Sequence, residues 1–260
     1  MLKPITDFID DLGACVLFVR DVLLTALTTP CSLESICEQI WKVTLQSMPT
    51  TAMAGFFVGA IMTVQFTMQI NAFGAIGYLG GLSTSATVRE VGPLLIAFLL
   101  SGKIGAFTSA ELGTMQVTEQ IDAIRCLGAD PMREIILPRF IGIICASFFL
   151  LAAGLVMSIF GGMLMGMMFS GINADEYVRH IPTIVTSFSI GNGLFKCLVF
   201  AVLLAAVCTY KGYTTRGGAK GVGRSVVSTA VMIMVGIVVS DWLTSLLSET
   251  ALNLYLGHGL

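Results

Sequence analysis

The chain has 260 residues, of which 55% are hydrophobic and only 12% are charged. Soluble domains carry about 25% charged residues, so these polar groups are too few to cover a water-exposed surface, and a lipid bilayer is the solvent that suits them. The formal net charge of −2 and the lack of a basic cluster between aromatic residues argue against nucleic acid as a partner.

The N-terminal segment, residues 5–29, is predicted to form an amphipathic helix. Its apolar residues recur at spacings of three or four: Phe8, Leu12, Val16, Val19, Leu23 and Leu27. Such a helix can lie in the membrane interface or pack against the cytoplasmic side of its own protein. Its polar face is acidic, which does not attract anionic lipids, so both interpretations stay open at this point.

Five later segments are long and apolar enough to cross a membrane, since spanning ~30 Å of hydrocarbon takes roughly 20 helical residues. They cover about 49–70, 91–110, 140–169, 191–210 and 225–247. The sequence therefore predicts an all-α integral membrane protein of about five transmembrane helices. No repeat of 20–50 residues is evident, so we expect one domain over residues 1–260.

Two loops carry most of the basic residues outside the N-terminal region and predict the orientation. The loop after the second span contains Arg125, Arg133 and Arg139, and the loop after the fourth contains Lys211, Arg216, Lys220 and Arg224. Loops separated by two spans lie on the same side, and the positive-inside rule makes that side cytoplasmic. The N-terminus is then cytoplasmic and the C-terminus periplasmic, as an odd number of spans requires.

The loop between the second and third spans is predicted to hold a short two-faced helix. Its apolar face comprises Val117, Ile121, Ile124 and Leu127, and its polar face comprises Glu119, Asp122 and Arg125. Gly128 and the Asp130-Pro131 pair predict where the helix stops. This helix could dock into a groove of a partner protein or could cover its own bundle.

Charged residues inside membrane spans are costly and are functional by default. Arg89 and Glu90 are neighbours that point about 100° apart on a helix, so they are not expected to pair with each other. They could contact a lipid head group or lie in interfacial water. Lys103 can extend toward the cytoplasm. Lys196 and Asp241 are predicted to be solvated ends of their helices.

Glycine residues form two kinds of pattern in this sequence. Gly55-x3-Gly59 and Gly162-x3-Gly166 allow close approach of helices, most simply within the chain, although a dimer could also use them. Gly218 to Ser225 is close to a P-loop, but Arg224 stands where a P-loop needs Lys, and a membrane helix precedes it instead of a buried strand. This stretch is better interpreted as a flexible basic loop that could meet phosphate head groups.

Three stretches resemble the MlaE/YrbE family: VREVGPLL (88–95), SGKIGAFTSAELGTMQVTEQIDAIRCLGADPMREIILPR (101–139) and KGYTTRGGAKGVGRSVVSTAV (211–231). This family comprises permeases of ABC transporters that work with MCE-domain proteins. The resemblance implies a homodimer in the bacterial inner membrane, with cytoplasmic ABC ATPases and a periplasmic MCE protein. Its cargo would be phospholipid exchanged between inner and outer membranes. It also implies an N-terminal interfacial helix, and no cofactor in this chain, because ATP is used by the partner ATPase.

The resemblance also implies two sets of site residues. The coupling helix received by the ATPase would run from Glu111 to Leu127, with Glu111, Met115, Val117, Glu119, Ile121, Asp122, Ile124, Arg125 and Leu127 as its main residues. The lipid cavity would be lined by Met62, Gln69, Ile70, Phe73, Arg89 and Glu90.

Two other functions would require features of a different kind in the sequence. A stand-alone secondary transporter would predict paired intramembrane carboxylates or inverted repeats, and neither is evident in the sequence. A membrane-embedded lipid-modifying enzyme would need a nucleophile or metal cluster. The two histidines, His180 and His258, belong to no catalytic motif.

Overall fold

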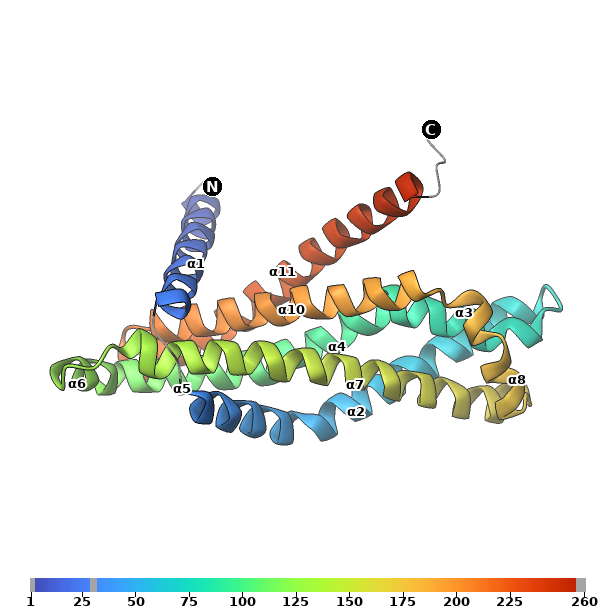
Figure 1. Cartoon of the computed structure of the whole chain (residues 1–260), viewed down its shortest axis with the longest axis horizontal. Helices are drawn as coiled ribbons and strands as arrows, with labels where there is room; N and C mark the ends of the chain where they lie inside the picture. Colours follow the sequence, from blue (N-terminus) through green and yellow to red (C-terminus); the bar gives the residue numbers. More distant parts are fainter. Residues whose placement is uncertain (1–2, 29–31, 256–260) are drawn as a thin grey trace. The chain divides into compact units, whose positions relative to one another are not determined.

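The computed structural model describes residues 3–28 and 32–255, with side chains described from 10 to 28 and from 32 to 252 (Figure 1). Within these ranges the regular elements are all helices, which confirms the all-α prediction. The predicted Phe8 position lies outside the described side chains, as does residue 29 at the predicted end of the first helix. The long helices are α1 (Lys3–Thr28), α2 (Leu33–Asn71), α7 (Leu137–Ser170), α10 (Ser187–Tyr213) and α11 (Gly218–Tyr255).

Between α2 and α7 the chain forms a series of shorter helices. They are η1 (Ile76–Tyr78), α3 (Leu79–Ala86), η2 (Thr87–Val91), α4 (Gly92–Leu100), η3 (Ser101–Gly105), α5 (Ala106–Val117), α6 (Gln120–Cys126) and η4 (Met132–Ile136). Two more, α8 (Ala174–Arg179) and α9 (Ile181–Ile184), precede α10. The elements η2, η3 and η4 are π-helical turns, which are rare and often occur at functional sites.

Five helical runs among the described residues are long and apolar enough to cross a membrane. They cover Leu33–Asn71, Ile76–Val117, Met132–Ser170, Ser187–Tyr213 and Gly218–Leu252. Each contains one of the predicted spans and extends beyond it at both ends, because polar residues continue the helix past the hydrocarbon-like core. The chain is therefore a multi-pass membrane protein with five candidate spans.

The chain forms two compact units. Unit 1 comprises residues 1–44, 101–146 and 201–234, and unit 2 comprises 45–100, 147–200 and 235–260. Helices α2, α7, α10 and α11 each contribute residues to both units. The single domain expected from the sequence stays a prediction.

In unit 2, glycines bring α2 and α7 into backbone contact. A Cβ atom at Gly55 would overlap the carbonyl of Gly154, and one at Gly59 would overlap the carbonyl of Ser158. From the other side, a Cβ atom at Gly161 would overlap the carbonyl of Phe56. The Gly55-x3-Gly59 pattern is therefore used within the chain, as expected, and small residues are what permits this approach.

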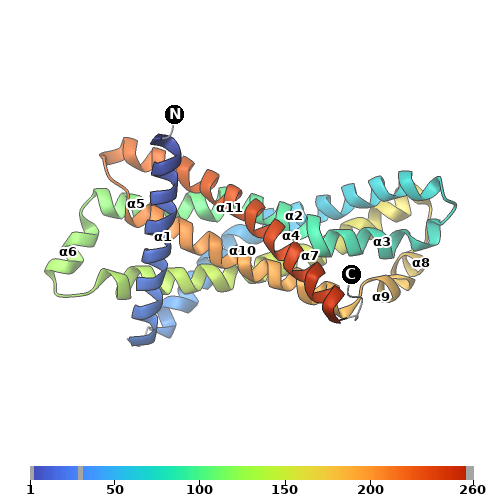
Figure 2. The same ribbon diagram turned by 90° about the horizontal axis from the view of Figure 1, so that it is seen from above.

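Tyr177 of α8 packs against the same pair of helices, α2 and α7, in unit 2. Its side chain is fully buried, and its hydroxyl lies 3.2 Å from the Thr63 Oγ1 atom and 3.0 Å from the Ser83 Oγ atom, close enough for a hydrogen bond to each. A Cβ atom at Gly162 would collide with the same hydroxyl. Helices α8 and α9 both pack against α3 (Figure 2). Residues 173–190 are thus anchored by a buried aromatic side chain.

In unit 1, α1 packs through a face that the apolar pattern did not identify. Cys15, Phe18 and Val22 are buried, and the Phe18 ring lies 5.8 Å from Tyr210 and 5.6 Å from Tyr213 between centroids. Burial raises the pKa of the Cys15 thiol to about 11, which keeps it protonated at neutral pH. α1 therefore does pack against its own chain.

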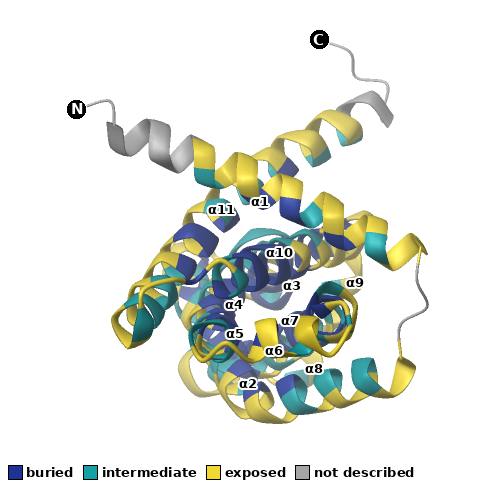
Figure 3. Cartoon of the chain, turned by 90° about the vertical axis from the view of Figure 1, so that its left-hand side faces the viewer, coloured by how far each residue is buried: buried dark blue, intermediate teal, exposed yellow. Residues whose placement is uncertain are grey.

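The predicted apolar stripe of α1 remains largely uncovered. Leu12, Val16, Leu23 and Leu27 are exposed, so one narrow face of the helix is buried and the others are open (Figure 3). An exposed apolar stripe of this kind suits insertion into a membrane interface. The two interpretations that the sequence left open therefore apply to different faces of one helix.

The contact between α2 and α7 generates a stability prediction. Replacing Gly59 by Ala should destabilise the protein by about 1–3 kcal/mol, because the new methyl group forces two backbones apart. Chemical unfolding in detergent micelles would measure the loss. The matched control is Gly191→Ala, a helical glycine of unit 2 whose Cβ would meet nothing within 4 Å. Equal stability of the two variants would contradict the assigned contact.

Candidate functional site

A buried ion cluster lies in unit 2, centred on Lys196 of α10. The Lys196 side chain is 0% exposed, and its Nζ atom donates hydrogen bonds to Glu90 Oε2 at 2.6 Å and to Ser245 Oγ at 2.8 Å. The Asp241 Oδ1 atom lies 2.9 Å from the same nitrogen, as an ion pair without hydrogen-bond alignment. One ammonium therefore holds η2, α10 and α11 together.

The prediction that Lys196 and Asp241 are solvated helix ends is wrong. Removing a lone ammonium from water costs several kcal/mol, and the two carboxylates beside the buried Lys196 side chain offset that cost here. Its partners come from two other helices and stand 106 and 45 positions away in the chain, so no local spacing could have indicated the cluster. The only sequence signal was three charged residues in otherwise apolar spans.

Arg89 and Glu90 have different partners, as their angular separation on a helix predicted. The Arg89 guanidinium donates to the Glu249 carboxylate at the exposed side of α11, whereas Glu90 faces the buried Lys196. Both residues lie in the π-helical turn η2. The turn therefore directs Arg89 to the exposed side of α11 and Glu90 between α10 and α11, where the Ser245 hydroxyl also donates to it.

The remaining lipid-binding candidates are not gathered into one lining. Phe73 is 85% exposed, Gln69 is exposed and Met62 is half-buried, whereas Ile70 is only 6% exposed. Ile70 packs with Leu79 and Ile172 in a small apolar cluster, so its side chain is already covered by its own chain. The prediction that these residues line a lipid cavity stays untested, but Ile70 offers no free surface for it.

A cavity that the sequence did not indicate adjoins the ion cluster along α10 and α11. It has a volume of about 360 Å³ and is lined by Phe188, Gly191, Asn192, Phe195, Thr244, Leu247, Ser248 and Ala251. Two lining residues, Asn192 and Ser248, lie one helical turn from Lys196 and Ser245 of the cluster, and the Ser248 hydroxyl donates to the Ser245 carbonyl. The buried Asn192 Nδ2 atom has no hydrogen-bond partner within the described side chains. An apolar cavity with one unsatisfied amide donor suits an amphiphile that carries an acceptor group.

The predicted coupling segment is not one helix, contrary to expectation. α5 ends at Val117, and α6 begins at Gln120 after Glu119 takes a left-handed conformation with φ 59°. This conformation is uncommon for residues other than Gly, so the sequence offered no sign of the break. The predicted stop is correct: Gly128 has φ 80°, and the Gly128 and Ala129 N–H groups bond to the carbonyls of Arg125 and Ile124.

The next helical run begins at the Asp130-Pro131 pair. The Asp130 side chain accepts a hydrogen bond from the Met132 N–H at 3.0 Å, and its carbonyl accepts from Arg133 and Glu134. An Asp cap followed by Pro in the first helical position is a favoured helix start, because Pro has no N–H to leave unpaired. The turn between α6 and α7 is therefore specified by its own residues.

Glu111 and Met115, at the start of the predicted coupling segment, contact helices of their own unit. The Glu111 carboxylate lies 2.9 Å from Lys42 Nζ of α2 and 3.3 Å from Arg139 Nη2 of α7. The Met115 sulfur lies 4.0 Å from Arg139 Nη1. These two residues therefore stabilise three helices of unit 1, and they are not presented outward as a docking helix would present them.

The short helix α6 carries the outward-facing part of the segment (Figure 1). Ile121 is 0% exposed, and Val117 and Ile124 are half-buried, whereas Leu127 is 84% exposed. Asp122 and Arg125 form an exposed ion pair at 3.1 Å, and Arg125 also bonds to the Tyr213 hydroxyl. The apolar face is thus partly used within the unit, and Glu119, Asp122, Arg125 and Leu127 remain accessible to a partner.

Comparison with known protein families gives a match that covers the five candidate spans. The permease MlaE family matches residues 36–247, which include all five candidate spans almost in full. The chain belongs to the permease MlaE family. Its membership makes it a membrane permease and not an enzyme in its own right. Among the described residues, no group of three or more His, Cys, Asp or Glu side chains could hold a metal ion.

Three proteins from different organisms are examples of the relatives to which this MlaE-family permease is similar. A protein of Rickettsia typhi described as a probable ABC transporter permease is 31% identical over 93% of both chains. The chloroplastic protein TRIGALACTOSYLDIACYLGLYCEROL 1 of Arabidopsis thaliana is 33% identical over 79% of this chain and 61% of its own. The intermembrane phospholipid transport system permease protein MlaE of Haemophilus influenzae is 26% identical over 88% of both chains.

The ion cluster generates a prediction about charge balance. Lys196→Met should destabilise the permease by about 3–5 kcal/mol, because Glu90 and Asp241 lose the cation that compensates them. Unfolding in detergent would measure the loss. Adding Glu90→Gln and Asp241→Asn to the same variant should restore much of the stability, because the remaining side chains are neutral. Failure of this rescue would show that Lys196 contributes through packing and not through charge.

Proposed function

We propose that this permease is the membrane-spanning subunit of an ABC transporter that moves phospholipids between the inner and outer membranes. The observation that carries the proposal is the ion cluster of Lys196, Glu90 and Asp241 beside the 360 Å³ apolar cavity. A phospholipid has a charged head group and apolar chains, and this part of unit 2 offers groups suited to both. The named phospholipid transport permease of Haemophilus influenzae supports the choice of cargo.

ATP hydrolysis belongs to a separate ATPase subunit in this proposal. The relatives described as ABC transporter permeases support it, and so does the exposed polar edge of α6, which offers a partner Glu119, Asp122, Arg125 and Leu127. Lys42, Glu111 and Arg139 connect the adjoining α5 to α2 and α7, so force applied at α6 would be transmitted to those helices. The coupling element in this proposal is therefore α6, supported by the Glu111 cluster.

The assembly that we propose is a homodimer with an MCE-domain protein on the periplasmic side. α11 is the least buried of the five candidate spans and presents Trp242, Leu246 and Leu247 outward, so it is the helix best suited to meet a second copy or lipid. The stretch 218–225 is helical and forms the first turns of α11, so the prediction of a flexible loop there is wrong. The basic segments between spans, with Arg125 in α6 and Lys220 in α11, still support a cytoplasmic position for α6 and for the N-terminus. The bacterial inner membrane is the location consistent with this assembly.

A stand-alone secondary transporter is the second candidate, and one observation favours it. Glu90 and Asp241, which are far apart in sequence, meet around Lys196 within the spans, and paired intramembrane carboxylates are typical of ion-coupled transporters. Such a protein would need no ATPase and would respond to an ion gradient. The two candidates therefore differ in their energy source.

The direct test of the proposal is transport. The tagged permease, extracted gently from native membranes, should co-purify with an ABC ATPase and an MCE protein, which mass spectrometry would identify. Reconstituted with them, it should move fluorescent phospholipid only with hydrolysable ATP, and Lys196→Met should reduce the rate at least 10-fold, because the charged site is disrupted. Recovery of the chain alone, with transport driven by a proton gradient, would establish the second candidate instead.

The coupling assignment has its own test. Glu119→Lys combined with Asp122→Lys should abolish ATPase binding while the permease stays folded, because both side chains are exposed and their charge is reversed. Pull-down of the ATPase and thermal unfolding in detergent would measure the two effects. The control is Asp175→Lys with Glu176→Lys, the same charge change on exposed residues of α8. ATPase binding as tight as in the control would overturn the role of α6.

A further inference from the structure

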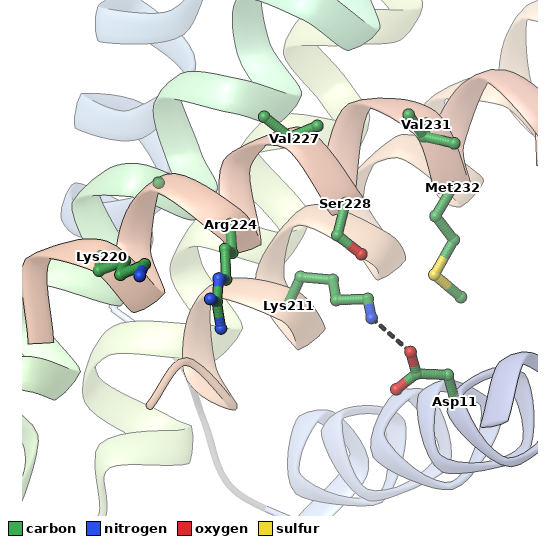
Figure 4. Close-up of a pocket in the computed structure, with 9 residues that line it drawn as sticks. Asp11, Lys211, Lys220, Arg224, Val227, Ser228, Val231 and Met232 are labelled. Carbon is green, nitrogen blue, oxygen red and sulfur yellow. Dashed lines mark hydrogen bonds and ion pairs between the residues drawn. The ribbon is translucent and has the colours of Figure 1, made fainter. Parts of the chain in front are cut away.

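Two adjoining cavities lie in unit 1 where α11 begins. The larger has a volume of about 720 Å³ and is lined by Asp11, Lys211, Lys220, Gly223, Arg224, Val227, Ser228, Val231 and Met232. The smaller has a volume of about 330 Å³ and shares Asp11, Lys211, Arg224 and Ser228 with it. Because they share these residues, the cavities form one depression bordered by α1, α10 and α11 (Figure 4).

The two cavities differ in chemistry. The larger has an apolar wall formed by Val227 and Val231, which lie on successive turns of α11, and by Met232 next to Val231. The smaller is lined instead by hydroxyl groups, those of Tyr210, Thr214, Thr215, Ser225 and Ser228. In Figure 4, Ser228 and Met232 point toward Lys211 and Asp11. A ligand that filled both cavities would need a polar end and an apolar end.

The depression carries an excess of positive charge. Lys211, Arg216, Lys220 and Arg224 line it, against the single carboxylate of Asp11. Asp11 is already paired with Lys211 at 2.6 Å. Within the described side chains no carboxylate pairs with Arg216, Lys220 or Arg224, and all three are exposed. Uncompensated cations of this kind attract an anion such as a phosphate group.

We propose that these cavities bind one anionic phospholipid, which stays with the permease as a structural ligand and is not cargo. Its phosphate contacts Arg216, Lys220 and Arg224, and one acyl chain follows Val227 and Val231. A free phosphate or a nucleotide would leave the apolar wall without a role. The inference uses no residue of the Lys196 cluster, and it rests on the proposed function only for placing these groups at the cytoplasmic leaflet.

The lipid would also strengthen the attachment of α1. Asp11 of α1 and Lys211 of α10 line both cavities together with the start of α11, so one ligand contacts three helices of unit 1. The other attachments of α1 include the Asp11–Lys211 ion pair, the Phe18 contacts with Tyr210 and Tyr213, and packing against η4. Loss of the lipid should therefore expose the Cys15 thiol, which is buried on the same face of α1.

The test is native mass spectrometry of the full-length permease in detergent, titrated with phosphatidylglycerol. Wild-type protein should retain one tightly bound phosphatidylglycerol. Lys220→Gln with Arg224→Gln should weaken that binding roughly 10- to 30-fold, since each basic residue near an anionic lipid contributes about fivefold. Cys15 should also react faster with maleimide in this variant. The control is Arg20→Gln with Arg179→Gln, which removes two exposed charges outside the cavities and should leave binding unchanged.

Inorganic phosphate and an isosteric wall variant distinguish the sources of the phosphate group. Millimolar phosphate should not displace the lipid, and Val227→Thr with Val231→Thr should weaken lipid binding severalfold through the acyl chain. Displacement by phosphate, with no effect of the threonines, would assign a free anion to the site and overturn the proposal. The Lys220/Arg224 variant could instead keep its lipid binding and change its monomer–dimer ratio. That result would assign the surface to a second copy of the chain and would also overturn the lipid proposal.

The result is independent of the transport proposal. Lipid binding is measured on the permease alone, so an absent ATPase partner would refute the ABC transporter assignment without touching this site. Equal lipid binding by wild type and by the Lys220/Arg224 variant would refute the lipid site while leaving ATP-driven transport intact.

Discussion

The neutralisation of Lys196 is the constraint on which unit 2 depends. An ammonium with no exposed surface cannot persist in an apolar surrounding unless opposite charge lies within contact distance. Here Glu90 and Asp241 supply that charge, and Ser245 supplies a further acceptor, so α10, α11 and the π-helical turn η2 are fixed relative to one another. The need to neutralise Lys196 therefore explains both the π-helical turn η2 in the second span and the polar residues Asp241 and Ser245 of α11.

Unit 1 is also held together by ion pairs between helices, and these pairs are more exposed than the Lys196 cluster. Glu111 is shared by Lys42 and Arg139, and Asp11 is paired with Lys211, so these ion pairs connect different helices of the unit. Exposed pairs contribute little free energy, but they fix the register of helices whose apolar surfaces would otherwise pack in several ways. α6 projects from this framework as a separate short helix, because Glu119 interrupts the run that the sequence pattern continues.

Much of the fold follows from the sequence, and the reasons are local. Five predominantly apolar stretches of sufficient length predict five spans, and Gly128 with Asp130-Pro131 predicts the turn before α7. The buried face of α1 was not predicted. Its three residues, Cys15, Phe18 and Val22, form a shorter apolar pattern than the stripe that remains exposed, so the longer stripe dominates the sequence pattern. The break at Glu119 was missed because no glycine marks it. The Lys196 cluster was missed because its members are brought together only by tertiary packing, whereas Arg89 and Glu90 could be singled out from their adjacency in a span.

The backbone contact of α2 with α7 has a mechanical consequence for any transport cycle. Glycine surfaces at Gly55, Gly59 and Gly161 leave no side chains between the two helices, so sliding one past the other by a single residue would bring a larger side chain against a carbonyl group. Within unit 2, α2 and α7 are therefore expected to move together as one rigid body. Any rearrangement of helices in such a cycle is therefore easier outside this contact, and the π-helical turns η2 and η3 are the places where the second span departs from regular α-helix.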